Sequence, residues 1–208
     1  MENMTTVGQL FIVSAPSGAG KTSLVKALLE SVSGVEVSVS HTTRAARSGE
    51  TEGVDYNFID ADGFQRLVEH HGFLEHASVF GNSYGTSKAL VEAKLAQGID
   101  IILEIDWQGA QQIRDVMENC CSIFVLPPSK QVLEERLRRR GQDSDDIIEE
   151  RMCTAVDEMS HYNEYDFLVV NDDFEIALNE IVAVVKSQRL VIQRGSHTHS
   201  ALINQLLN

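Results

Sequence analysis

Apolar residues along the chain follow two patterns. Short runs that are almost wholly apolar are typical of strands buried on both faces of a sheet, whereas segments with an apolar residue every three or four positions are typical of amphipathic helices. The two kinds of segment alternate, which predicts an α/β fold with a mostly parallel sheet and helices on both of its faces. The expected buried strands are 10–15, 99–106, 121–126 and 165–172. The expected helices are 21–32, 62–72, 86–98, 129–141, 144–162 and 174–193.

Further strands are expected between the first two buried runs. Residues 35–43 ("VEVSVSHTT") alternate between apolar and polar, which predicts one half-buried strand. A short strand is expected at 56–60, and two strands joined at "GNSYG" are expected at 73–85. At the far end, residues 194–208 are polar and then apolar, which favours a loose end over a small helix packed on a neighbour.

The first buried run leads into a phosphate-binding loop. The general pattern is Gly, any four residues, then Gly-Lys-Ser/Thr, between a strand and a helix. Backbone N–H groups around Gly18 and Gly20 are expected to surround a phosphate. Lys21 is expected to reach the outer phosphates, and the Thr22 hydroxyl to ligate Mg²⁺. The loop departs from the pattern only in its first residue and consists of Ala15, Pro16, Ser17, Gly18, Ala19, Gly20, Lys21 and Thr22.

Composition narrows the range of partners. The 208 residues carry a net charge of −14, whereas binding to a nucleic-acid backbone requires an excess of Lys and Arg. The sequence has no apolar run of the length of a membrane span and no signal-like start. Its three cysteines lack metal-ligand spacing, which indicates reduced thiols. We therefore expect a cytoplasmic protein that binds small anionic ligands, without nucleic-acid or membrane partners.

A phosphate-binding loop alone fits a kinase, a GTPase switch or an ATP-driven machine. Glu104 and Asp106 lie two residues apart at the end of a buried strand, so their side chains are expected on one face. An acid near a phosphate loop can hold Mg²⁺ or its water shell. "DWQG" (106–109) matches a short GTPase element, but the sequence has no Asn-Lys-x-Asp motif for reading guanine, which disfavours the switch.

A second anion site is expected just after the half-buried strand. Arg44 and Arg47 lie three residues apart, and Glu50 and Tyr56 follow them. Two guanidinium groups and a phenol hydroxyl can clamp a phosphate. A solvated charged loop is the alternative. The phosphate-binding loop favours the clamp, because it implies a second partner that carries a phosphate.

The chain resembles the guanylate kinases over about residues 8–190. The similarity rests on "SAPSGAGKTSL", "SVSHTTRAARSGETEGVDYNF", "FLEHASVFGNSYGTS", "EIDWQGAQQIR", "RRRGQDSDD" and "YDFLVVNDDF". It implies transfer of a phosphate from ATP to GMP in purine nucleotide metabolism, with ATP as co-substrate and Mg²⁺ as cofactor. It also implies a P-loop fold in a single domain over 1–208. The implied core spans about 8–37, 98–128 and 159–190, the inserted GMP-binding segment about 38–97 and the helical lid about 129–158.

The resemblance also implies roles for individual residues. The implied catalytic residues are Lys21, Arg44, Asp106, Arg140 and Arg151, the last two as lid arginines that close over the ATP phosphates. Arg136, on the helix face of Arg140, and Asn171, beside the adenine, are implied on the ATP side. The implied GMP site consists of Ser40, Arg44, Arg47, Glu50, Tyr56, Glu75, Tyr84, Thr86, Glu104 and Asp106.

The chemistry of guanine agrees with the implied role of Glu75 in reading the base. Guanine offers N1–H and an amino group side by side, and one carboxylate can accept both. Adenine lacks this pair of donors and would leave the carboxylate unpaired.

Two alternative functions remain open: a monophosphate kinase with another acceptor, such as a thymidylate-type enzyme, and a non-catalytic guanylate-kinase-like binding module. A homo-oligomer formed through the C-terminal helix also remains open.

Overall fold

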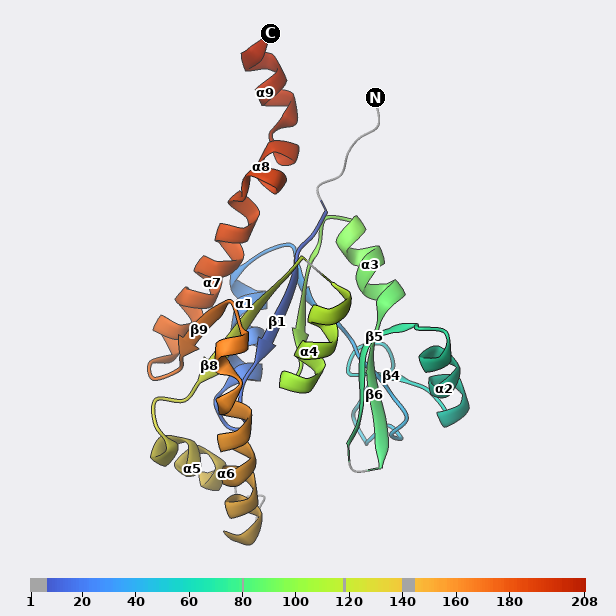
Figure 1. Ribbon diagram of the computed structural model, residues 1–208, viewed down its shortest axis with the longest axis vertical. Helices are drawn as coiled ribbons and strands as arrows, with labels where there is room; N and C mark the ends of the chain where they lie inside the picture. The colour runs from blue at the N-terminus through green and yellow to red at the C-terminus, as the bar shows by residue number, and fades with distance from the viewer. Residues whose placement is uncertain (1–6, 80, 118, 140–144) are drawn as a thin grey trace.

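The core of the protein is a five-stranded parallel sheet with the strand order β2-β7-β1-β8-β9 (Figure 1). The computed structural model describes residues 7–79, 81–117, 119–139 and 145–208, with the side chains of Val79 and Asp145 excepted. All neighbouring strands in this sheet run parallel. The strands are β1 (Leu10–Ser14), β2 (Val35–Val37), β7 (Asp100–Glu104), β8 (Cys120–Leu126) and β9 (Phe167–Val170).

Helices cover both faces of this sheet, so the predicted fold class is confirmed (Figure 1). Side chains of β1 alternate between the faces, because successive residues of a strand point in opposite directions. Phe11 and Val13 join one hydrophobic cluster with α1 and α7, whereas Leu10 and Ile12 join another with α3 and α4. Among the described residues, no helix combines the length and apolar character needed to cross a membrane. The four helices are α1 (Lys21–Ser31), α3 (Lys88–Ala96), α4 (Trp107–Val116) and α7 (Phe174–Leu190).

A second, smaller sheet with the order β4-β3-β6-β5 holds much of the segment between β2 and α3. The single strand expected at 35–43 is wrong, because the chain forms strands of two different sheets there. Val35–Val37 pairs with β7, whereas His41–Thr42 pairs antiparallel with β6. The alternation of apolar and polar residues runs across the break because both strands are partly buried. The elements of this segment are β3 (His41–Thr42), β4 (Asn57–Phe58), α2 (Ala61–Glu69), β5 (Phe73–Val79) and β6 (Asn82–Ser87).

Two helices, α5 (Lys130–Arg139) and α6 (Asp145–Ser160), lie beyond the end of β8, at the bottom of Figure 1. They pack against each other through Leu133, Leu137 and Ala155, all of which are buried. A short 3₁₀ helix (Tyr162–Glu164) then leads back to β9. The pair is therefore held together by a small hydrophobic cluster beyond the end of the sheet.

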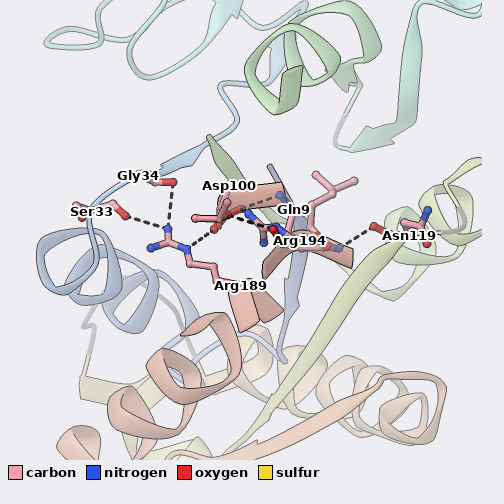
Figure 2. Close-up of polar contacts among 9 residues, drawn as sticks. Gln9, Ser33, Gly34, Asp100, Asn119, Arg189 and Arg194 are labelled. Carbon is pink, nitrogen blue, oxygen red and sulfur yellow. Dashed lines mark hydrogen bonds and ion pairs between the residues drawn. The ribbon is translucent and has the colours of Figure 1, made fainter. Parts of the chain in front are cut away.

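One buried carboxylate ties the C-terminal helices to the sheet (Figure 2). Asp100 accepts hydrogen bonds from Arg189 Nε and Arg194 Nη2, each at 2.8 Å, and from the backbone N–H of Gln9 at 2.7 Å. Its side chain is 1% exposed, so the two guanidinium groups compensate a charge that water does not reach.

The C-terminal tail is helical rather than a loose end. It consists of α8 (Ile192–Thr198) and α9 (Ser200–Leu207), which extend away from the sheet (Figure 1).

Candidate active site

The phosphate-binding loop connects β1 to α1, as the sequence predicts. Gly18 and Gly20 have φ angles of 93° and 98°, in the left-handed region that other residues rarely adopt. A Cβ atom on Gly20 would also collide with the Asn171 amide. That amide donates to the Ala19 carbonyl at 2.7 Å from just beyond β9, and Asn171 is 4% exposed. A buried side chain from the far end of the chain therefore braces the loop.

Lys21 begins α1 and lies among acidic side chains. Its Nζ donates to the Ile105 carbonyl, just after β7, at 3.3 Å. Desolvation lowers the pKa of Lys21, and the nearby carboxylates of Glu104, Asp106 and Glu158 oppose that shift. The ammonium group is thus placed at the head of the loop, where it can pair with a phosphate.

Two acids at the end of β7 lie beside the loop. The Thr22 hydroxyl donates to Glu104 Oε2 at 3.0 Å. Asp106 Oδ1 accepts from the Gly109 N–H at 2.8 Å and so caps α4, a helix that the hydrophobic pattern does not predict. No group of three His, Cys, Asp or Glu side chains suited to a metal occurs within the described ranges. The oxygens of Thr22, Glu104 and Asp106 do fit Mg²⁺, which commonly takes one or two protein ligands together with substrate phosphates.

Glu50 organises the arginine clamp. Its Oε1 accepts from Arg44 Nη2 at 2.7 Å, and its Oε2 accepts from the Arg47 backbone N–H at 2.8 Å. The hydrogen bond from Arg44 holds the pKa of Glu50 below its usual range. The Arg44 guanidinium lies 5.3 Å from the centre of the Tyr56 ring, which in turn lies 6.0 Å from the Tyr84 ring. Arg44 is therefore oriented beside two phenols, whereas the Arg47 side chain is exposed.

Glu75 and Thr86 form a buried polar pair across β5 and β6. Thr86 Oγ1 donates to Glu75 Oε1 at 2.5 Å, and the two residues are 1% and 7% exposed, respectively. Burial raises the pKa of Glu75, and the hydrogen bond from Thr86 opposes the shift. Because a buried carboxylate is costly unless it is hydrogen-bonded, a ligand with adjacent N–H donors would stabilise Glu75.

One cavity connects the loop to part of the predicted acceptor site. It has a volume of about 530 Å³ and is lined by Lys21 and Thr22 on one side. Ser40, Tyr56 and Thr86 line it on the other side. Residues that are far apart in the sequence thus open into the same space.

A second cavity, of about 320 Å³, lies against the loop on the side of α5 and α7. Arg136 and Asn171 line it, and Arg136 Nη2 donates to the Asn171 carbonyl at 3.0 Å. Sequence reasoning missed Arg139, Asp172 and Phe174, which also line this cavity. Arg139 could have been found, because it lies three residues after Arg136 on one helix face. Asp172 and Phe174 belong to no pattern beyond their place after the last strand.

A third cavity, of about 300 Å³, follows the loop itself and is also lined by Asp106 and Glu158. Sequence reasoning also missed Glu158, which lies on α6 and belongs to no phosphate-binding motif. Of the two predicted lid arginines, Arg140 lies outside the described residues. Arg151 is half-buried on α6 and does not line any of these three cavities.

Transfer between two phosphate-bearing molecules requires both binding sites to open into one space. That arrangement, at the end of the first strand of a parallel sheet, defines the class of P-loop kinases. Comparison with known proteins narrows the class. The family model described as guanylate kinase matches residues 7–188. The chain belongs to the guanylate kinase family.

Relatives and a solved structure match almost the whole chain. A guanylate kinase of Photorhabdus laumondii is 56% identical over 202 residues, which cover 96% of this chain and 98% of that protein. A guanylate kinase of Saccharophagus degradans is 54% identical over 205 residues, which cover 99% and 100%. The crystal structure of guanylate kinase from Anaplasma phagocytophilum is 36% identical with a TM-score of 0.72, covering 91% of this chain and 90% of that one.

Proposed function

We propose that this protein transfers the γ-phosphate of ATP to GMP, which gives ADP and GDP. The observation that carries the proposal is a cavity lined both by Lys21 and Thr22 of the loop and by Ser40, Tyr56 and Thr86 of the predicted acceptor site. The acceptor atom is a phosphate oxygen, which is mostly ionised at neutral pH. No side chain therefore has to act as a nucleophile or strong base, and catalysis depends on positioning and on stabilising charge.

On the donor side, backbone N–H groups of the phosphate-binding loop and the positive end of α1 bind the ATP phosphates. Lys21 pairs with the outer phosphates. Mg²⁺, when bound, neutralises charge on the phosphates. The Thr22 hydroxyl is the protein group best placed to hold the metal. Glu104 and Asp106, as carboxylates at the end of β7, would orient its water ligands.

On the acceptor side, Arg44 binds the GMP phosphate with the Tyr56 and Tyr84 hydroxyls beside it. The ion pair with Glu50 fixes the planar guanidinium before the substrate arrives, which lowers the entropy lost on binding. Glu50 is thus a positioning residue that acts through Arg44. Arg47, exposed on the same loop, would complete the clamp by turning toward the phosphate.

The guanine base is read by the buried pair of Glu75 and Thr86, with Ser40 beside it. An ionised Glu75 accepts the N1–H and amino hydrogens of guanine in a bidentate manner. Burial disfavours the ionised carboxylate of Glu75. Hydrogen bonds from guanine therefore also offset the desolvation penalty that this carboxylate has in the free protein. A base without these two donors would leave Glu75 unpaired and would be rejected.

The remaining assignments follow the division of the chain that the resemblance implies. The segment 38–97 would bind GMP, and the segment 129–158 would act as the lid over ATP. We assign Arg136, Arg140 and Arg151 to the ATP phosphates. Asn171 braces the loop and borders the cavity proposed for the adenine end of ATP. A cytoplasmic location, where GMP is recycled, fits this activity.

A coupled assay of ADP formation would test the proposal. The purified protein is incubated with ATP and Mg²⁺ and with GMP, AMP, CMP or dTMP, and a reaction without acceptor measures hydrolysis. We expect kcat/KM for GMP to exceed that for AMP by at least ~100-fold, because a site built around hydrogen bonds rejects a base that cannot make them. Preferential use of dTMP would support a thymidylate-type enzyme instead. Binding of GMP without transfer to any acceptor would support a binding module.

A further inference from the structure

Glu158, on α6, reaches across to the phosphate-binding loop. Its Oε2 accepts a hydrogen bond from the Ser17 backbone N–H at 3.3 Å. The side chain also lines the cavity along the loop, together with Lys21 and Asp106. The amides of such a loop serve to bind the phosphates of a nucleotide. A carboxylate of the protein is not required there, yet Glu158 accepts from one of them.

The surroundings of Glu158 both oppose and favour its ionised form. Desolvation and the nearby charge of Asp106 raise the pKa of Glu158, whereas the Ser17 N–H and the Lys21 ammonium lower it. Glu158 therefore carries part of the interactions that a bound phosphate would make. A phosphate has more charge and more acceptor oxygens, and can replace the carboxylate.

The helix that carries Glu158 is coupled to the rest of the α5–α6 pair. Ala155, one turn earlier, is buried against Leu133 and Leu137 of α5. The same two leucines lie close to the loop, since a Cβ on Gly18 would be 3.0 Å from Leu133 Cδ1 and 3.1 Å from Leu137 Cδ2. The pair thus rests on the loop through an apolar contact from α5 and a polar contact from α6.

We propose that Glu158 is an internal competitor for the ATP phosphates, which occupies the anion site of the loop and leaves it when the nucleotide binds. The proposal rests on the proposed function, because it takes the loop to be the ATP site. Two anions cannot share the amides and the ammonium group of Lys21, so ATP binds more weakly than the loop alone would allow. Displacement of Glu158 also removes the polar contact that keeps α6 on the loop.

Calorimetric titration with ATP, in the absence of GMP, would test the competition. Glu158→Gln removes the charge but keeps the shape, and should tighten ATP binding by roughly 3- to 30-fold, both with Mg²⁺ and with EDTA. Asp157→Asn is the matched control, because it removes the same charge from an exposed neighbour on the same helix. We expect the control to stay within about twofold of the wild-type affinity.

A second variant separates competition from simple charge repulsion. Glu158→Asp keeps the charge but is shorter by one methylene, so its carboxylate is withdrawn from the Ser17 N–H. Competition predicts tighter ATP binding for this variant too, whereas repulsion through space predicts the wild-type affinity. Melting temperatures and GMP affinities of all variants, measured in parallel, report whether the fold is intact.

Three results would overturn the inference. Unchanged ATP affinity of folded Glu158→Gln would show that the carboxylate does not compete. Wild-type affinity of Glu158→Asp would reduce its effect to repulsion. Weaker binding by Glu158→Gln only with Mg²⁺ would make Glu158 a partner of the metal's water shell. All three leave the proposed function standing, which fails instead if the wild-type protein does not bind ATP, and in that case the inference fails with it.

Discussion

The proposed donor and acceptor halves of the active site are built in different ways. The donor loop follows directly from β1, all five residues of which are buried, and continues into α1. The acceptor residues are spread over more than 40 positions of the sequence, from Ser40 to Thr86, on a sheet whose strands β3 and β4 have only two residues each. The donor geometry is thus set by a continuous stretch of backbone on a buried support. The acceptor geometry is set by contacts between side chains.

This difference separates the expected effects of substitutions. A change in the donor loop should reduce transfer to every acceptor alike, because the loop binds phosphates that do not vary. A change in the acceptor half should alter the preference among acceptors, because the side chains there are the ones proposed to read the substrate.

Lys21→Ala should have the largest effect. Loss of the ammonium group at the outer phosphates should lower kcat by about 10³-fold or more, because charge stabilisation dominates phosphoryl transfer. Steady-state assays with GMP and with AMP should show the same relative loss. Lys26→Ala, at an exposed position of the same helix, serves as the control. A folded Lys21→Ala protein that keeps more than a tenth of the wild-type kcat would show that the donor site is misplaced.

Glu75→Gln should change the preference for the base. The amide NH₂ would face the donors of guanine, a buried mismatch that costs about 1–3 kcal/mol. In kcat/KM for GMP this corresponds to a loss of roughly 5- to 150-fold. AMP should lose much less, because it has no amino group at that position. Both values are measured at saturating ATP, with the exposed Glu69→Gln as control. An unchanged ratio of GMP to AMP would mean that Glu75 does not read the base.

Arg44→Lys should weaken GMP binding by about 10-fold, since the charge remains but the planar fork and one hydrogen bond to an ionised partner are lost. ATP affinity, measured by calorimetry without GMP, should stay within about twofold, because the Arg44 side chain contacts Ala45, Glu50 and Tyr56, which lie outside the donor loop. Equal losses of ATP and GMP affinity would place Arg44 on the donor side or in the folding of the protein, and would contradict the separation of the two halves.

The smallest expected effect concerns stability. Burial raises the pKa of Glu75 above its ordinary value of 4.5, so the folded state disfavours the charged form. The resulting loss of stability is absent below the unfolded pKa and is complete once the pH exceeds the folded pKa. Glu75→Gln should therefore raise the melting temperature at pH 8, by roughly 2–4 °C for each 1 kcal/mol of the relieved penalty in a chain of this size. At pH 4 the gain should vanish, and a gain independent of pH would refute this account.

The donor half could be predicted from the sequence because its chemistry is contiguous. Strand, loop and helix follow one another, and each residue type has a local reason to be there. In the acceptor half, the clamp of Arg44 and Arg47 could be predicted from its local spacing. The base-reading residues could be located only through the resemblance, since the pairing of Glu75 with Thr86 depends on the register of β5 and β6. Glu158 was missed for the same reason: it reaches Ser17 across 141 positions, and only the packing of α6 brings it to the loop.

The apolar–polar pattern also gave a wrong prediction where two neighbouring strands share the same alternation. The alternation from 35 to 43 is the same in β2 and β3, and nothing in it marks where the chain leaves the first sheet for the second. Helix α4 was missed because its buried residues, Gly109, Ala110 and Ile113, include only one large apolar side chain, and the clearest sign of its start is the Asp106 cap. A capping signal has to be looked for residue by residue, because it leaves no trace in hydrophobic periodicity.

The buried carboxylate of Asp100 has a consequence for the order in which the chain becomes stable. Its guanidinium partners, Arg189 and Arg194, lie 89 and 94 positions later, so a ribosome completes β7 long before either exists. Until then the nascent chain must keep Asp100 in water or bear an unpaired charge in its interior, at about 3–5 kcal/mol. We therefore expect the central sheet to close late in synthesis. A chain that stops before Arg189 would remain an incomplete fold, open to proteolysis.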